Sequence, residues 1–109
     1  MKARSEVNNR VAIITVDGDI NLYEIQILRD EFDNVRNLEL KKLIIDLTNV
    51  DFIDSSGVGL LISQSTKFQE KKVDFMLVGI KSGLEHLFRL TSFARLFKRF
   101  SKLQDAIDF

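Results

Sequence analysis

Apolar residues form several short runs that have the length and composition of β-strands. Residues 11–16, 43–47 and 73–78 are rich in Val, Ile, Leu and Phe, and this pattern predicts three strands. Residues 43–47 are apolar on both faces except at Asp46, so we expect this strand to be central and covered by helices on both sides. A weaker alternation over residues 2–7 predicts an edge strand, which a turn at Asn8-Asn9 joins to the next strand.

Between these strands, apolar residues recur at the three- and four-residue spacing of a buried helix face. The first predicted helix covers residues 22–35, with an N-cap at Asn21 and a reciprocal acid at Glu24. Further helices are predicted over residues 58–68, 84–91 and 103–109, the last one after a short strand over 96–100. The residues expected on the buried stripes of the first two helices are Leu22, Ile25, Leu28, Phe32, Val35, Val58, Leu61, Ile62 and Phe68.

This order of elements predicts an α/β fold. We expect a mixed, mostly parallel sheet of four to five strands flanked by about four helices, folded as one domain over residues 1–109. Because the carboxyl ends of parallel strands share one edge of a sheet, the loops at residues 17–19, 51–57 and 79–80 are expected to meet on one rim. In open α/β sheets this rim is the usual binding site.

Two serines, Ser55 and Ser56, lie where a predicted buried strand leads into a helix. The first turn of a helix has unpaired N–H groups and the positive end of the helix dipole, so it favours a negative charge. A serine hydroxyl there can gain such a charge by phosphorylation. The alternative is that the hydroxyls only cap the helix, because Ser and Asp are favoured caps. Capping does not account for Gly57 and Gly59, which let another backbone approach closely.

Composition and charge exclude several function classes. The 109 residues include 16 basic and 16 acidic residues, so net charge gives no general attraction for nucleic acid or for an anionic membrane. With no Cys and one His, the chain has no disulfide framework, thiolate chemistry or multi-His metal cluster, and we expect no cofactor. No segment has the pattern of a signal peptide or of a membrane-spanning helix, so we expect a cytoplasmic protein with no membrane partner.

The segment Asp-Ser-Ser-Gly-Val-Gly at residues 54–59 resembles the signature of the STAS domain family, and within it the stand-alone bacterial anti-sigma factor antagonists. Residues 18–20 are similar to the family's Gly-Glu/Asp-Leu/Ile turn, and residues 90–97 to its late Leu-Thr-Gly-Leu-x-x-Leu-Phe segment. Chain length and element order also agree. The chain departs from the family pattern at Asn21, where the family often has Asp, and at Ser92-Phe93, which replaces a common Gly-Leu pair.

The resemblance implies a regulatory module rather than an enzyme. Its partner would be an anti-sigma factor that is also a serine kinase of the histidine-kinase-like ATPase superfamily. The kinase would phosphorylate Ser55, the first serine after the motif Asp, and so break the complex. A metal-dependent phosphatase of the PP2C type would restore it. The residues that we expect to contact the partner are Asp19, Asn21, Asp54, Ser56 and Gly57.

Two alternatives concern the serine motif itself. The chain could instead be a structural STAS subunit of a lipid-transport or signalling complex, with no phosphorylation cycle. The acceptor serine, which structural members of the family can lack, favours the antagonist. A Ser–His–Asp hydrolase is disfavoured, because Ser55 lacks the Gly-x-Ser-x-Gly elbow and His86, the single His, lies in a later helix.

Two further alternatives concern other residues. Asp46, Asp51 and Asp54 are carboxylates of the kind that bind Mg²⁺, but a strand position and turn and cap roles explain them. Residues 89–102 interleave basic side chains with three phenylalanines, as single-stranded nucleic-acid binders do. Because the spacing of these phenylalanines favours their burial, we expect no direct nucleic-acid partner.

Overall fold

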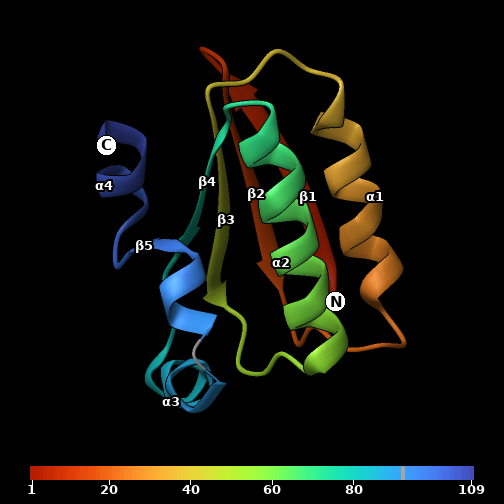
Figure 1. Cartoon of the computed structure of the whole chain (residues 1–109). Helices are drawn as coiled ribbons and strands as arrows, with labels where there is room; N and C mark the ends of the chain where they lie inside the picture. The colour runs from red at the N-terminus through yellow and green to blue at the C-terminus, as the bar shows by residue number, and fades with distance from the viewer. Residues whose placement is uncertain (92) are drawn as a thin grey trace.

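The computed structural model describes residues 1–91 and 93–109, apart from the side chains of Leu87, Leu90, Thr91, Phe93 and Ala94. Over these residues it has five strands, four α-helices and one short 3₁₀ helix (Figure 1). In chain order they are β1 (Lys2–Asn8), β2 (Val11–Asp17), α1 (Ile25–Arg36), β3 (Lys42–Asn49), α2 (Ser55–Glu70), β4 (Asp74–Val78), α3 (Ser82–Thr91), η1 (Phe93–Leu96), β5 (Lys98–Phe100) and α4 (Leu103–Asp108).

The strands form one mixed sheet in the order β1-β2-β3-β4-β5. β1 runs antiparallel to β2, whereas β2, β3, β4 and β5 run parallel to one another. Helices α1 and α2 lie side by side against one face of the sheet, and α4 lies against the opposite face (Figure 1). The predicted α/β fold with a mostly parallel sheet is therefore confirmed.

The central strand β3 buries both of its faces. Leu43, Ile45 and Leu47 lie in the larger hydrophobic core beneath α1 and α2, whereas Ile44 lies in a smaller core with Ala106 of α4. Because successive side chains of a strand point to opposite faces, a strand between two helical layers must be apolar at nearly every position. The larger core also holds aromatic rings whose centroids are 6.1 to 6.3 Å apart, those of Phe32, Phe68, Phe75 and Phe97.

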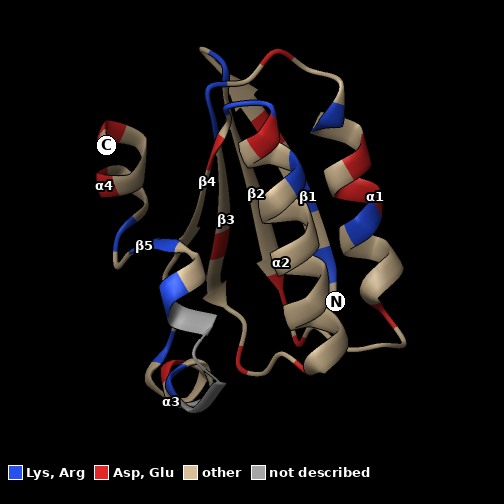
Figure 2. Cartoon of the chain, in the orientation of Figure 1, with Lys and Arg blue, Asp and Glu red and all other residues tan. Residues whose placement is uncertain are grey.

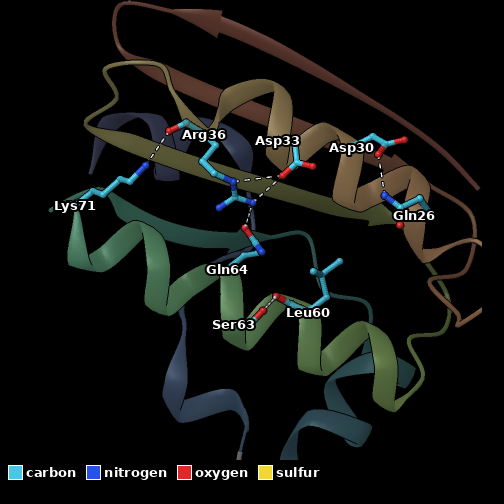
Figure 3. A network of polar contacts seen from close by, with 8 residues as sticks. All are labelled: Gln26, Asp30, Asp33, Arg36, Leu60, Ser63, Gln64 and Lys71. Atoms are coloured by element: carbon cyan, nitrogen blue, oxygen red, sulfur yellow. Dashed lines mark hydrogen bonds and ion pairs between the residues drawn. The ribbon is translucent and has the colours of Figure 1, made fainter.

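Polar contacts join α1 to α2 at the end of the two helices that lies away from Ser55 (Figure 3). The guanidinium of Arg36 donates to Oδ1 of Asp33 at 3.1 Å and to Oε1 of the buried Gln64 at 2.7 Å. Nζ of Lys71 donates to the backbone carbonyl of Arg36 at 3.1 Å. These contacts join the carboxyl-terminal end of α1 to the second half of α2, and the loops that lead into the two helices lie at the other end.

The first helix differs from the prediction at its start. Helix α1 begins at Ile25 rather than at residue 22, and Leu22 is 66% exposed instead of buried. Asn21 does act as a cap, because its Oδ1 accepts hydrogen bonds from the N–H groups of Tyr23 and Glu24. The turn that it caps precedes the helix, and the side chain of Glu24 pairs with the amino group of Met1 instead of with Asn21.

Smaller differences concern other boundaries. The hairpin turn lies at Asn9 and Arg10, which both have positive φ, rather than at Asn8-Asn9. Helix α2 begins at Ser55, before the predicted residue 58, and Ile62 is half-buried rather than buried. Strand β5 is shorter than predicted because residues 93–96 form η1. The other residues predicted for the buried stripes of α1 and α2 are buried: Ile25, Leu28, Phe32, Val35, Val58, Leu61 and Phe68.

The carboxyl-terminal part of the chain tests some predictions and not others. Phe97 is buried, as expected, whereas Phe100 is half-buried against Phe109 rather than buried. The predicted burial of Phe93 and the departure from the family pattern at Ser92-Phe93 lie outside the described residues.

Candidate functional site

Two loops meet at the carboxyl end of the sheet: the β2–α1 loop (residues 18–24) and the β3–α2 loop (residues 50–54). The N–H of Ile20 donates to the carbonyl of Phe52, and the N–H of Asp54 donates back to the carbonyl of Ile20, each at 3.0 Å. These bonds continue the parallel pairing of β2 and β3 beyond the strand ends. The two loops therefore form one continuous surface beside the start of α2.

Asp54 caps α2 and at the same time binds the β2–α1 loop. Its Oδ1 accepts hydrogen bonds from the Ser56 hydroxyl at 2.5 Å and from the Gly57 N–H at 3.0 Å. Its Oδ2 accepts one from the N–H of Leu22 at 2.9 Å. The Ser56 hydroxyl, followed by the Gly57 N–H, lowers the pKa of Asp54 below its ordinary value of 3.8, because these donors favour the charged form. Asp54 is therefore ionised at neutral pH.

Ser55 and Ser56 differ in exposure and in hydrogen bonding. Ser55 is the first residue of α2 and is exposed, and within the described part of the chain its hydroxyl makes no hydrogen bond. Ser56 is half-buried, and its hydroxyl donates to Asp54. A phosphate donor can reach the Ser55 hydroxyl without breaking an existing bond, whereas modification of Ser56 would remove a hydrogen-bond partner of Asp54.

The two glycines of the first turns of α2 have different surroundings. A Cβ at Gly57 would lie 2.6 Å from Cγ2 of Ile53 and 2.7 Å from Cγ2 of Ile20, closer than any side chain tolerates. A Cβ at Gly59 would meet nothing within 4 Å, and Gly59 is exposed. Gly57 thus permits the close approach of α2 to the two loops of its own chain. Gly59 leaves the surface of α2 open to another molecule.

The structure brings the sequence-predicted site residues to one end of the molecule. Asp19 is exposed on the β2–α1 loop, and Asn21 is half-buried on the same loop. The others lie at the junction of the β3–α2 loop with α2, where Gly57 is buried and Asp54 and Ser56 are half-buried. Hydrogen bonds between the loops therefore place together residues that are more than thirty positions apart in sequence, as the Asp54–Leu22 contact illustrates.

Three exposed apolar side chains near the serines were not identified from the sequence as surface residues. Leu22 lies beside Asp54, Tyr23 follows it and is 96% exposed, and Phe52 on the adjoining loop is 51% exposed. Exposed aromatic and aliphatic groups next to polar side chains are typical of protein interfaces. For Phe52 the available signal was its position in the turn segment before the serine motif, where a large apolar side chain has no core to enter. Tyr23 fell within the first predicted helix, off its buried stripe.

Several acidic residues lie in the loops at this end of the sheet (Figure 2). Asp19 and Asp51 are exposed, and Asp54 is half-buried at the start of α2. Among the described residues, two cations pair with acids of these loops: Nζ of Lys81 with Oδ1 of Asp51 at 2.7 Å, and the amino group of Met1 with Oε2 of Glu24 at 2.6 Å. A phosphate on Ser55 would therefore add to a surface that is already negative.

The residues considered for other chemistries have structural roles. Asp46 accepts hydrogen bonds from the N–H and the hydroxyl of Thr48, at 3.0 and 2.6 Å, and Asp51 pairs with Lys81. Among the residues that the structure describes, no three His, Cys, Asp or Glu side chains are grouped to hold a metal ion. His86 is exposed on α3. No helix in the described ranges is long and apolar enough to cross a membrane.

Known proteins resemble this chain in both sequence and fold. The sequence profile of the STAS domain family matches residues 2–106. The anti-sigma-F factor antagonist RsfB of Mycobacterium tuberculosis is 30% identical over 100 residues, which cover 92% of this chain and 81% of that protein. An anti-sigma factor antagonist from Mycobacterium paratuberculosis has the same fold, with a TM-score of 0.87 at 23% identity over 98% of this chain and 91% of the other. The Bacillus cell fate determinant SpoIIAA, solved in its phosphorylated form, has a TM-score of 0.73 at 18% identity over 97% of this chain and 96% of its own. The chain belongs to the STAS domain family.

Proposed function

We propose that this STAS domain is an anti-sigma factor antagonist that phosphorylation of Ser55 switches off. The domain binds an anti-sigma factor and thereby releases the sigma factor. The anti-sigma factor is also a serine kinase, which transfers the γ-phosphoryl group of ATP to Oγ of Ser55 and leaves ADP. The phosphorylated domain dissociates until a PP2C-type phosphatase hydrolyses the phosphoserine. In this cycle the domain works in the cytoplasm as a binding partner and a substrate, and it catalyses no reaction.

The observation that carries this proposal is the exposure of Ser55. The hydroxyl lies at the first residue of α2 and has no hydrogen-bond partner within the described part of the chain. The unpaired N–H groups of a helix N-terminus tolerate the charge of a phosphate. The name of RsfB, an anti-sigma-F factor antagonist, supports the antagonist role, and the phosphorylated form of SpoIIAA means that a protein with this fold can carry a phosphate.

We assign the partner-binding surface to the exposed parts of the two joined loops. The apolar centre of this surface is formed by Leu22, Tyr23 and Phe52. Burial of such side chains is the main source of favourable free energy in association. Polar groups around them fix the orientation of the partner. The polar residues that we assign to this role are Asp19, Asn21, Asp54 and Ser56. Gly57 contributes to the surface by allowing α2 to pack closely against Ile20 and Ile53 of the two loops.

Phosphate would break the complex through its charge at the interface. A phosphoserine carries about −1.5 to −2 charges at neutral pH. A partner that fits around a neutral hydroxyl would have to desolvate this dianion among the acidic groups Asp19, Asp51 and Asp54. An uncompensated charge in a buried contact costs several kcal/mol, which corresponds to about 10²- to 10⁴-fold in affinity. The fold itself need not change, because a negative charge at a helix N-terminus is stabilising by about 0.3–1 kcal/mol.

Affinity capture from the native cell tests the proposal. Wild type and Ser55→Ala should retain an anti-sigma factor that carries a serine-kinase domain, and Ser55→Asp should lose it. Thr66→Asp is the matched control, because it places the same charge on an exposed hydroxyl residue of α2 that lies eleven positions from Ser55. This variant should retain the partner. Incubation with the captured kinase and ATP, followed by mass spectrometry, should place the phosphate on Ser55.

Two results would contradict the proposal. One is a phosphate found on Ser56 or elsewhere but not on Ser55. The other is a captured complex that contains no kinase and is the same for wild type and Ser55→Asp. That second result would favour the alternative of a structural STAS subunit without a phosphorylation cycle.

A further inference from the structure

The exposed side chains of the β2–α1 loop require a restraint if they are to act as a pre-formed binding surface. Leu22 and Tyr23 are the most exposed large apolar residues near Ser55, and they lie in a turn before α1 rather than in the helix. A loop that is ordered only on binding lowers affinity by the entropy of that ordering. A contact that holds Leu22 and Tyr23 in place therefore raises the affinity of this surface for its partner.

Among the described residues, Ile20 is the last residue of the β2–α1 loop that shares a backbone–backbone hydrogen bond with the β3–α2 loop. Beyond that point, Asn21 accepts hydrogen bonds from Tyr23 and Glu24, but these bonds stay within the same loop. Among the described residues, two side-chain contacts tie this stretch to other parts of the chain. The amino group of Met1 pairs with Oε2 of Glu24, and the N–H of Leu22 donates to Oδ2 of Asp54 at the start of α2.

The two carboxylate oxygens of Asp54 have separate tasks. Oδ1 accepts from the Ser56 hydroxyl and from the Gly57 N–H, which is the capping interaction of α2. A cap requires only one side-chain oxygen, and Asn and Ser serve as well as Asp. Oδ2 has no part in the cap and binds Leu22. A carboxylate, unlike an amide or a hydroxyl, can do both, because all of its lone pairs accept hydrogen bonds.

We propose that Asp54 is a positioning residue that holds Leu22 and Tyr23 in the conformation that the partner binds, separately from its role as the cap of α2. This inference rests on the proposed function for the identity of the partner. The part that concerns the loop does not, because the geometry of the loop can be measured on the domain alone.

Asp54→Asn separates the two tasks. An Asn oxygen can still accept from Gly57, but its NH₂ group then faces the N–H of Leu22, donor against donor. Asp54→Ser is a second variant, whose hydroxyl can cap α2 but is too short to reach the other loop. Ser56→Ala is the matched control, since it removes one bond to Oδ1 and leaves Oδ2 on Leu22.

The experiment measures amide exchange by NMR on the full chain, and then affinity for the anti-sigma factor recovered with wild type. In both Asp54 variants the Leu22 amide should exchange about tenfold faster, with the Gly57 amide changed by no more than about twofold. The dissociation constant should rise about tenfold, as for the loss of one charge-assisted hydrogen bond. Ser56→Ala should leave the Leu22 exchange rate at the wild-type value.

An unchanged Leu22 exchange rate in both Asp54 variants would overturn the inference. Faster exchange at Leu22 with unchanged affinity would also overturn it, because the loop would then be held without consequence for binding. Equal loss of protection at Leu22 and Gly57 in both variants would also overturn it, because Asp54 would then act only as the cap of α2. Failure of wild type to bind any anti-sigma factor would instead contradict the proposed function, and the exchange rates would still decide whether Asp54 holds the loop.

Discussion

Ser55 and Ser56 are adjacent in the sequence, but the fold gives them different roles. The hydroxyl of Ser56 donates to Asp54, and that of Ser55 points to solvent from the first residue of α2. The sequence motif predicts that one of two neighbouring serines is an acceptor, and family resemblance selects the first. Hydrogen bonding provides an independent physical reason for the same choice, because only one of the two hydroxyls is free of a structural bond within the described residues.

Replacement of Ser55 should leave the stability of the domain nearly unchanged. Asp54, not Ser55, caps α2, so Ser55→Ala removes no capping bond. We expect the free energy of unfolding to change by no more than about 0.5 kcal/mol, as for ordinary surface substitutions. Urea unfolding followed by circular dichroism measures this. A loss of about 1 kcal/mol or more would mean that the Ser55 hydroxyl does contribute to the cap.

The ionised form of Asp54 should give the domain a pH-dependent stability. The Ser56 hydroxyl and the Gly57 N–H lower the pKa of Asp54 in the folded state below its ordinary value of 3.8. A lowered folded-state pKa means stabilisation that is present above pH 3.8 and is lost as the pH falls through the folded-state pKa. The difference in unfolding free energy between wild type and Asp54→Asn should therefore shrink as the pH falls below 3.8. A difference that stays constant from pH 7 to about 2 would contradict this assignment.

At the scale of elements, the first turns of α2 combine tight packing with an open surface. Gly57 faces Ile20 and Ile53 at distances that exclude a Cβ, whereas Gly59 faces open space. Both glycines are in the same helix, so their helix propensities are equal. A comparison of the two sites therefore isolates the effect of the contact.

Gly57→Ala and Gly59→Ala should change stability in opposite directions. Gly57→Ala forces Ile20 or Ile53 to move and should destabilise the domain by about 1–3 kcal/mol. Gly59→Ala should stabilise it by up to about 1 kcal/mol, because Ala is the better helix former and no atom obstructs its Cβ. Thermal unfolding of the two variants and wild type measures both effects. Equal shifts in melting temperature would show that the loops do not pack on Gly57 as described.

The sequence predicts helices and strands well where burial in the core determines their positions. It predicts element boundaries less well where contacts between loops determine them. The stripe of Ile25, Leu28 and Phe32 is visible from spacing alone, because each residue must reach the core. Leu22 continues the same spacing but is exposed, because it lies in a turn before α1, where its N–H binds Asp54 of the other loop. No local pattern contains that contact, since the two residues are 32 positions apart.

At the scale of the molecule, order and direction of the strands follow from the alternation of strands and helices. The apolar run of β3 predicts its central place, and the parallel pairing of β2, β3 and β4 then brings their following loops to one rim. The rim itself was predictable, and so was the presence of Ser55 on it. The exposure of Leu22 and Tyr23 was not, because a turn bound to Asp54 of the other loop replaces the predicted first turn of the helix.

The whole molecule should respond to phosphorylation as a rigid body. The hydrogen bonds of Asp54 and the packing of Gly57 hold the start of α2 independently of Ser55. The contrasting possibility is that phosphate melts the first turn of α2 and so removes the binding shape. The two possibilities differ in what happens to the free domain, which makes them distinguishable without knowledge of the partner's structure.

The most direct test is to titrate the anti-sigma factor, by calorimetry, with the unmodified domain and with the domain phosphorylated on Ser55. Amide exchange is measured on both forms of the free domain. We predict that phosphorylation weakens binding by at least about 100-fold. Protection of residues 58–62 and the melting temperature should stay close to those of the unmodified domain. Equal affinities of the two forms would contradict the switch, and weaker binding with lost protection over residues 58–62 would contradict its surface-charge mechanism.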